Sequence, residues 1–331
     1  MFSGRSCPAP FIDMGRPINV LIDTDIGTDI DDAIALVLAA KSGAVRLAGV
    51  TTVSGNAVMR AKIATHLLRL CGYAQIPVAA GAGGTCSDSP CQFFPDKMLH
   101  YCVGADAVSL ILEKARELDN LMIITLGPLT NIASCMKKDP VTMQKAELYI
   151  MGGMVGRAFP EGNIATDPEA ARIVFDSPIR KTLFPLYVTT RCNFSAELIE
   201  RVFHTKQEPN HTLYQMFDCW KRDVLVPILK GWGEEVDAET LRASAGLHDP
   251  MTVAGLLWPD LFHFRSTCVR VEIEGQYGRG LTLEQVNPFR QNEPVERSIL
   301  VADDVDTVGF LERLTSVLQG EQPYQYKVKE Y

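Results

Sequence analysis

Short apolar runs alternate with longer amphipathic stretches along most of this chain. The runs are rich in β-branched residues, which is typical of buried strands. They are INVLI (18–22), RLAGVTTV (46–53), LMIITL (121–126), ELYIM (147–151) and TLFPLYV (182–188). Helical patterns follow most of them, including 31–41 and 57–70. Because strands that alternate with helices are joined by right-handed crossovers, the pattern predicts a mainly parallel sheet flanked by helices.

The pattern changes in the second half of the chain. From about 195 to 245 it is largely helical and contains several aromatic residues. Two strand-like runs, CVRVEIE (268–274) and RSILVA (297–302), come next, and a last helix is predicted near 305–318. We therefore expect the central sheet to resume after a helical insertion.

Length and composition favour one domain. The chain has 331 residues, and 47% of them are hydrophobic, which is sufficient for one large core. No low-complexity linker or internal repeat divides it. We expect a single Rossmann-like α/β domain over residues 18–325, with the helical insertion at about 195–245 and a loose leader over 1–17.

Charge and cysteine usage exclude several functional classes. The net charge is −8 and no basic run is longer than a pair, which argues against a nucleic-acid partner. No stretch approaches the roughly 18 apolar residues of a membrane span, and the first 17 residues lack the apolar core of a signal peptide. Nine cysteines without CxxC pairs predict reduced thiols and a cytoplasmic location.

Five aspartates are concentrated in DTDIGTDIDDA (23–33), directly after the first predicted strand. Close carboxylates raise one another's pKa unless a cation or a proton lies between them. Asp31 or Asp32 could cap the helix that follows, but one cap needs one acid. A bound divalent cation explains the surplus. Since the stretch contains no histidine or cysteine, its oxygen ligands predict Ca²⁺ or Mg²⁺ rather than zinc.

Other polar groups follow later elements of the predicted sheet. They are Asn56, the turn Leu126-Gly127-Pro128, the pair Gly152-Gly153 with Glu161 and Asn163 beyond it, and His248-Asp249-Pro250. Loops at the carboxyl ends of parallel strands surround the ligand crevice, so these groups are expected to converge on one site. Asp249 before Pro250 also fits a helix cap followed by proline, and Asp167 before Pro168 is assigned to capping.

Three familiar motifs fit these residues less well. An EF-hand starting at Asp23 would need Gly and Glu where Thr28 and Ile34 stand. A Mg²⁺ phosphatase of the haloacid dehalogenase type also has an Asp-x-Asp pair after its first strand, and Asp303-Asp304 resembles its late acidic pair. Gly27, however, stands where that family has Thr or Val, so the phosphatase is the weaker alternative. GAGG (81–84) lacks the third glycine of a dinucleotide fingerprint.

Five segments together resemble the calcium-dependent inosine–uridine-preferring nucleoside hydrolases. They are DTDIGTDIDDAIAL, LGPLTNIA, IMGG, EGNIATDPEAA and HDPMTVA, within about residues 20–255. The resemblance implies the nucleoside hydrolase fold and an enzyme that hydrolyses ribonucleosides to ribose and free base, in nucleoside salvage or catabolism. It further implies a water activated by Ca²⁺ and an aspartate, and a homo-oligomer, either a dimer or a tetramer.

The resemblance also implies roles for individual residues. Ca²⁺ would be bound by the carboxylates of Asp25, Asp32 and Asp249 and by the main-chain carbonyl of Leu126. Asp25 would also take the proton from the water. The ribose hydroxyls would be bound by Asp31, Asn56, Glu161 and Asn163. His248 would protonate the leaving base, a role that suits a side chain titrating near neutral pH. A catalytically inactive relative that binds Ca²⁺ and a ribosyl ligand is disfavoured because all these residues are present.

Two departures from the family pattern affect details. The first loop is longer, with Asp25 six residues before Asp31, so Asp29 also satisfies the usual spacing. We assign the site to Asp31-Asp32, because the helix continues directly after them. Asp29 is then expected to lie next to the ligands without binding the ion itself. The segment between Met151 and Glu161 is short and lacks an asparagine that often contacts the sugar.

Base recognition is expected in the loops at 82–104 and 210–245. Their aromatic and basic candidates are Phe93, Phe94, His100, Tyr101, Tyr214, Phe217, Trp220, Arg222 and Trp232. At helical spacing most aromatic residues belong to the core. Purine-specific relatives can have tryptophan at the residue before Asp249. The histidine found here favours either a broad base specificity or a preference for oxopurine and pyrimidine bases.

Overall fold

A computed structural model of the chain describes residues 18–83, 101, 103–104, 106–231, 245–285 and 298–321. Its strands are β1 (Ile18–Thr24), β2 (Val45–Thr52), β3 (Val78–Ala80), β4 (Leu121–Thr125), β5 (Glu147–Met151), β6 (Arg180–Phe184), β7 (Asn193–Phe194), β8 (Ala245–Gly246), β9 (Phe262–Val271), β10 (Thr282–Gln285) and β11 (Ile299–Val305). Its α-helices are α1 (Asp31–Lys41), α2 (Ala57–Leu70), α3 (Ala107–Glu117), α4 (Thr130–Lys138), α5 (Pro140–Met143), α6 (Gly162–Thr166), α7 (Pro168–Asp176), α8 (Leu186–Thr189), α9 (Ala196–Phe203), α10 (Asn210–Trp220), α11 (Val226–Gly231), α12 (His248–Leu257) and α13 (Thr307–Gln319). A π-helical turn (Lys221–Leu225) joins α10 to α11, and a 3₁₀ turn (Pro259–Leu261) follows α12.

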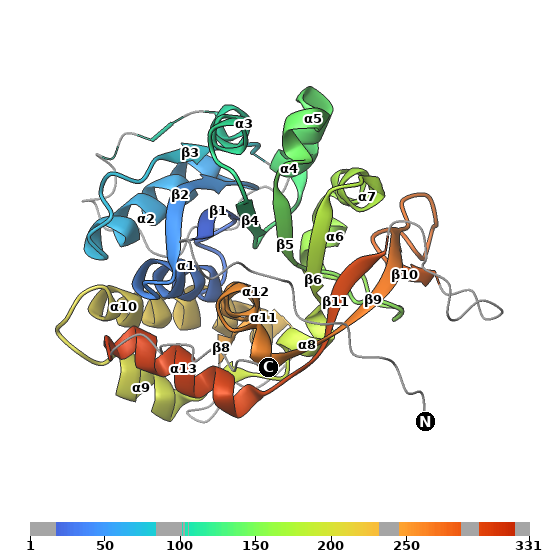
Figure 1. The fold of residues 1–331 in the computed structure, drawn as a ribbon. Coiled ribbons are helices and arrows are strands. Elements are labelled where there is room, and N and C mark those ends of the chain that lie inside the picture. The colour runs from blue at the N-terminus through green and yellow to red at the C-terminus, as the bar shows by residue number, and fades with distance from the viewer. Residues whose placement is uncertain are drawn as a thin grey trace, which may run out of the picture.

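A nine-stranded sheet dominates the described part of the chain (Figure 1). Its strand order is β10-β9-β11-β6-β5-β4-β1-β2-β3. The strands from β11 to β3 pair in parallel, whereas β9 is antiparallel to β11 and to β10. In register, Asp23 of β1 lies between Thr51 of β2 and Thr125 of β4. The mainly parallel sheet flanked by helices confirms the predicted fold class.

Two hydrophobic cores cover the two faces of this sheet. Along β1, Val20 and Ile22 belong to the core that includes residues of α1, α2, α12 and α13. Leu21 points to the other face and packs with residues of α3, α4 and α7. Figure 1 shows the same arrangement, with α3, α4 and α7 above the sheet and α1, α12 and α13 below it. The alternation follows from the two-residue period of a strand, and it explains why buried parallel strands are apolar throughout.

Two predicted strands differ from the structure by several residues at one end or both. The strand expected over 182–188 ends at Phe184, and α8 begins at Leu186. Pro185 lies between them and has no N–H for a strand ladder, while the N–H of Leu186 donates to the carbonyl of Gly153 at 2.9 Å. The strand predicted at 268–274 starts at Phe262 and ends at Val271.

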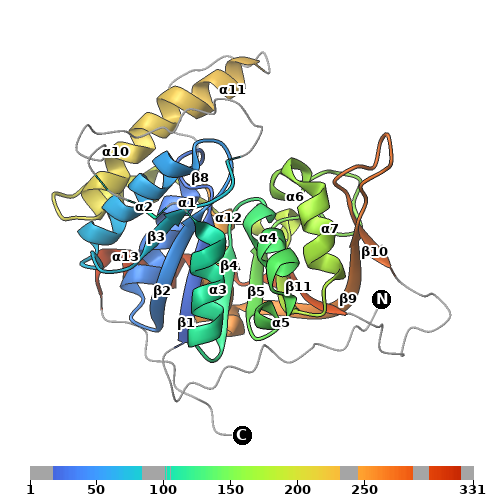
Figure 2. The same cartoon turned by 90° about the horizontal axis from the view of Figure 1, so that it is seen from above.

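The described part of the predicted insertion is helical. The helices α10 and α11, with the π-helical turn between them, form a rod that projects past the end of the sheet (Figure 2). Phe217 and Trp220 of α10 are buried in the core rather than presented on a loop. Four other base-contact candidates lie outside the described residues: Phe93, Phe94, His100 and Trp232. No described helix has the length and apolar character needed to cross a membrane.

Candidate functional site

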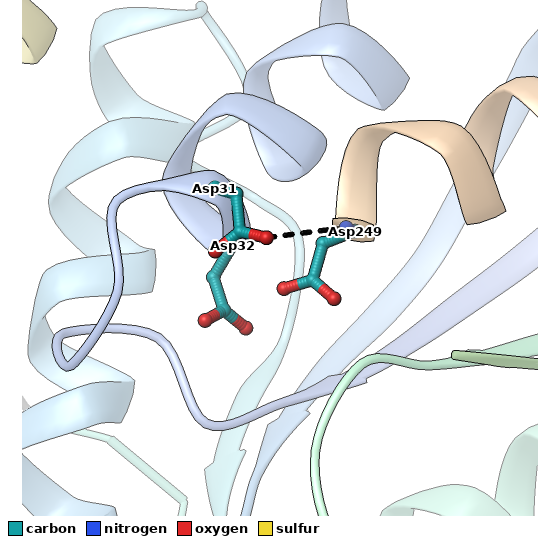
Figure 3. A group of neighbouring side chains, drawn as sticks. All are labelled: Asp31, Asp32 and Asp249. Carbon is teal, nitrogen blue, oxygen red and sulfur yellow. Dashed lines mark hydrogen bonds between the residues drawn. The ribbon is translucent and has the colours of Figure 1, made fainter. Parts of the chain in front are cut away.

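Three aspartates from opposite parts of the sequence meet at the amino-terminal ends of two helices. Asp31 and Asp32 lie in the first turn of α1, and Asp249 is the second residue of α12. One carboxylate oxygen from each lies within 4.8 Å of the other two. Figure 3 shows the carboxylates gathered on one side of the two helix ends. The main-chain N–H of Asp249 donates to Oδ2 of Asp31 at 3.3 Å, which links the two helices directly.

None of these three carboxylates caps its own helix. The residues before α1 and α12 are Ile30 and Leu247, and neither helix has a side-chain cap. The capping alternative is therefore wrong for Asp31, Asp32 and Asp249. It is confirmed for Asp167, whose Oδ1 accepts from the N–H of Ala170 at 3.0 Å.

The three carboxyl groups of this cluster are buried. Asp31, Asp32 and Asp249 are 5%, 3% and 4% exposed. Loss of solvent, with repulsion from neighbouring carboxylates, raises the pKa of Asp31 to about 7 and the pKa values of Asp32 and Asp249 well above the ordinary value. The Thr24 hydroxyl donates to Asp32. The all-oxygen donor set fits a hard divalent cation such as Ca²⁺ or Mg²⁺.

Asp25 lies beside this cluster but is not one of the three. It is half-buried, and its Oδ1 would lie 2.8 Å from a Cβ added to Gly127, so its carboxylate rests against the turn after β4. Loss of solvent raises the pKa of Asp25 to about 7, the Arg60 guanidinium opposes this shift, and the charges of Asp29 and Asp31 add to it. Glycine at residue 127 permits this close approach.

Leu126 places a main-chain carbonyl at the same edge of the sheet. Its N–H donates to the carbonyl of Asp23 at 2.8 Å, which fixes the turn after β4 against β1. Its own carbonyl accepts from Nδ2 of Asn163 at 2.7 Å. A carbonyl oxygen has two lone pairs, so Leu126 keeps one for a further ligand.

Arg60 is a buried cation that the sequence prediction did not include. From α2 it donates to the carbonyls of Ser54 and Ile26, each at 3.0 Å, to the Thr28 hydroxyl at 2.8 Å, and to the carbonyl of Asp25. These bonds fix the aspartate loop after β1 to the loop after β2. A signal was present in the sequence, since Arg60 lies on the apolar stripe of α2.

The predicted ribose-binding residues are in different environments. Glu161 is buried and accepts from the N–H groups of Gly153 at 2.8 Å, Asn163 at 2.9 Å and Ile164 at 3.2 Å. Burial raises its pKa, and these bonds oppose the shift. Asn163 reaches the Leu126 carbonyl, as described above. Asn56 is exposed and caps α2 through the N–H of Met59 at 3.1 Å.

His248 opens α12 and lies immediately before Asp249. Its Nδ1 is 2.9 Å from the Thr189 hydroxyl. Burial lowers the pKa of His248, and the charges of Asp29 and Glu161 oppose that shift. The exposed Asp29 accepts a hydrogen bond from the indole N–H of Trp220 at 3.0 Å, so the extra length of the first loop contacts α10.

Asp303 and Asp304, the acidic pair that supported the phosphatase alternative, form ion pairs with arginines. Asp303 accepts from Nε of Arg265 at 3.0 Å, and Asp304 pairs with Arg191. Both aspartates belong to β11 and are exposed. Their pairing with arginines removes the feature that made the late sequence resemble a phosphatase site.

Comparison with known proteins gives a consistent result. The family model of the inosine-uridine preferring nucleoside hydrolases matches residues 20–312. The pyrimidine-specific ribonucleoside hydrolase RihA of Photobacterium profundum is 33% identical over 92% of this chain and 99% of its own. A plant nucleoside hydrolase, PpNRh1, has a TM-score of 0.73 at 25% identity over 92% of this chain and 99% of its own. The purine-preferring ribonucleoside hydrolase of Gardnerella vaginalis has a TM-score of 0.72 at 26% identity over 92% and 98%.

Proposed function

Because the chain belongs to the inosine-uridine preferring nucleoside hydrolase family and is a ribonucleoside hydrolase, we propose that it works with Ca²⁺ at the aspartate cluster. The observation that carries this proposal is the convergence of buried carboxylates at the start of α1 and α12. Asp25, Asp32 and Asp249, with the Leu126 carbonyl, would hold the ion. When bound, Ca²⁺ orients the ribose hydroxyls and lowers the pKa of water.

The chain's own residues supply the rest of the chemistry. Asp25 accepts the proton of the attacking water, because its carboxylate lies against the turn after β4, at the edge of the aspartate cluster. Asp31, Asn56, Glu161 and Asn163 bind the ribose hydroxyls and orient the sugar. The anionic cluster also stabilises the positive charge that the ribosyl group gains as the glycosidic bond breaks. His248 donates a proton to the departing base.

We expect hydrolysis to depend strongly on the ribose 2′-hydroxyl. Removing it leaves buried polar partners unpaired, so each 2′-deoxynucleoside should react at least about 10²-fold more slowly than its ribonucleoside. The measurement is kcat/KM for uridine, cytidine, inosine and guanosine, each with its 2′-deoxy counterpart. Equal rates on a ribonucleoside and its deoxy form would refute the proposed sugar site.

The same panel ranks the bases. We place pyrimidine ribonucleosides first, because the curated relatives named as pyrimidine-specific are 31–33% identical to this chain, whereas the purine-preferring solved structure is 26% identical. A clear preference for guanosine and inosine would reverse this order without affecting the proposed reaction.

The purified protein should contain about one tightly held Ca²⁺ per chain. Elemental analysis measures the content, and a chelator should lower the melting temperature, because removal of the ion leaves the buried carboxylates to repel one another. Readdition of Ca²⁺ should restore both activity and melting temperature. Stoichiometric zinc without calcium would contradict this assignment.

Compartment and assembly are also part of the proposal. The described cysteines at 71, 135, 192, 219 and 268 are free thiols, which supports a reducing compartment such as the cytoplasm. A homo-oligomer, dimer or tetramer, is expected from the family, and light scattering measures it.

A further inference from the structure

Thr189 contacts the Nδ1 edge of the His248 ring. It is fully buried at the end of α8, and its Oγ1 is 2.9 Å from Nδ1 of His248. The short helix that contains Thr189 exists because Pro185 ends β6, so the chain turns back toward α12. The contact thus joins two elements that the sequence separates by 59 residues.

The other ring nitrogen faces the backbone of β8. A Cβ added to Gly246 would lie 2.6 Å from Nε2 of His248 and 3.1 Å from its Cδ2. The glycine therefore leaves room for this edge of the ring. The Thr189 hydroxyl thus holds the imidazole at Nδ1, and Gly246 has no side chain that would displace Nε2.

The hydrogen bonds of Thr189 decide which nitrogen carries a fixed proton. Its Oγ1 is 3.3 Å from the carbonyl of Leu186, which can only accept. An imidazolium donates from both ring nitrogens, so when His248 carries the proton for the leaving base, the Thr189 oxygen accepts from Nδ1–H. The hydroxyl proton of Thr189 is then available to the Leu186 carbonyl. With Nδ1 protonated in this way, Nε2 is the nitrogen that can gain and lose a proton.

We infer that Thr189 is a positioning residue that keeps the Nδ1 proton of His248 in place and thereby directs proton transfer through Nε2 to the leaving base. The inference rests on the proposed role of His248 as the leaving-group acid. Thr189 itself does not touch the substrate. It acts as the hydrogen-bond acceptor that orients the acid, a task that a carboxylate performs in hydrolase triads.

The step balances as a single proton transfer. The C–N bond of the nucleoside breaks, its electron pair goes to the base nitrogen, and the Nε2–H bond breaks as an N–H bond forms on the base. His248 passes from imidazolium to neutral imidazole and keeps its Nδ1–H bond to Thr189 throughout. Solvent returns the proton to Nε2 before the next turnover.

The test compares two substrates in the holoenzyme. One is uridine (or inosine, if it is the better substrate), whose base needs a proton to depart. The other is p-nitrophenyl riboside, whose leaving group departs as a stable anion. Thr189→Val keeps the shape and removes the hydroxyl, and we expect it to lower kcat on the nucleoside about 10- to 100-fold. On p-nitrophenyl riboside the change should stay within about 3-fold, and KM and calcium content should not change.

The chain offers a matched control. Thr190 is the exposed neighbour of Thr189, and its hydroxyl also bonds the carbonyl of Leu186, at 2.8 Å. Thr190→Val should keep kcat on both substrates. Thr189→Ser, which restores an acceptor at the same place, should recover most of the nucleoside activity. If Thr189→Val does not fold, Thr189→Ala takes its place, since it removes the hydroxyl without adding a methyl group.

The outcomes distinguish the role inferred for Thr189 from the role proposed for His248. Equal losses on both substrates would show that Thr189 supports the fold of the site and would overturn the inference, as would full activity of Thr189→Val. His248→Ala, measured in parallel, tests the premise itself. If His248→Ala slows the nucleoside selectively and Thr189→Val does not, the inference fails and the role of His248 stands.

Discussion

Asp249→Ala is expected to abolish tight calcium binding and to lower ribonucleoside hydrolysis by about 10²-fold or more. It removes the one carboxylate that α12 contributes to the cluster. An ion held by charged oxygen ligands contributes several kcal/mol to a transition state, and each 1.4 kcal/mol corresponds to a tenfold change in rate. Calcium content, kcat and KM are measured together.

The folded structure should survive this substitution. Loss of one of three mutually repelling buried carboxylates relieves repulsion in the metal-free protein, and the hydrogen bond to Asp31 comes from the main chain of residue 249. The melting temperature without metal should therefore be equal or higher. Asp119→Ala, at the exposed opposite end of β4, is the control and should keep both calcium and activity. Unchanged calcium content and kcat in Asp249→Ala would exclude Asp249 from the ligand set.

His248→Ala should leave calcium bound and slow the chemical step. General acid catalysis contributes about 10²–10⁴-fold, so a loss of that size is expected in kcat on uridine. The loss should shrink on p-nitrophenyl riboside, because its leaving group needs no proton. The adjacent Asp249 keeps its place in α12 because its backbone hydrogen bonds do not involve the imidazole.

The two substrates separate the possible roles of His248. A large and equal loss on both would mean that the ring positions the site rather than protonating the base. A negligible loss on uridine would mean that another group activates the leaving base. Comparison with Asp249→Ala is informative, since that variant should lose activity on both substrates.

The sheet and its first two crossovers could be predicted from the sequence because their signals are local. The runs at 18–22 and 147–151 are mostly apolar, and the helices at 31–41 and 57–70 have the predicted limits. The run at 182–188 was harder, since apolar residues on both sides of Pro185 continue the strand-like composition. There a tertiary hydrogen bond, from Leu186 to Gly153, accompanies the turn that starts α8.

For the candidate site, the sequence could predict which polar residues lie near strand ends, but not the contacts that their side chains make. The gathering of Asp31, Asp32 and Asp249 follows from strand–helix order and the family resemblance. The contacts of Arg60 and Thr189 do not, because each depends on how a side chain of one element reaches a backbone or ring of another. No periodicity encodes that a threonine on α8 meets a histidine on α12.

The link between α1 and α12 has a consequence for synthesis of the chain. Asp31 and Asp249 are 218 residues apart, so at about 5–20 residues per second the ribosome delivers the third carboxylate roughly 10 to 45 s after the first. During that time the nascent chain has its amino-terminal aspartates but lacks one carboxylate of the proposed ion site. We therefore expect a truncated or stalled product that stops before α12 to lack the proposed ion site and to be inactive, so that hydrolytic activity arises late in translation, when most of the chain has been made.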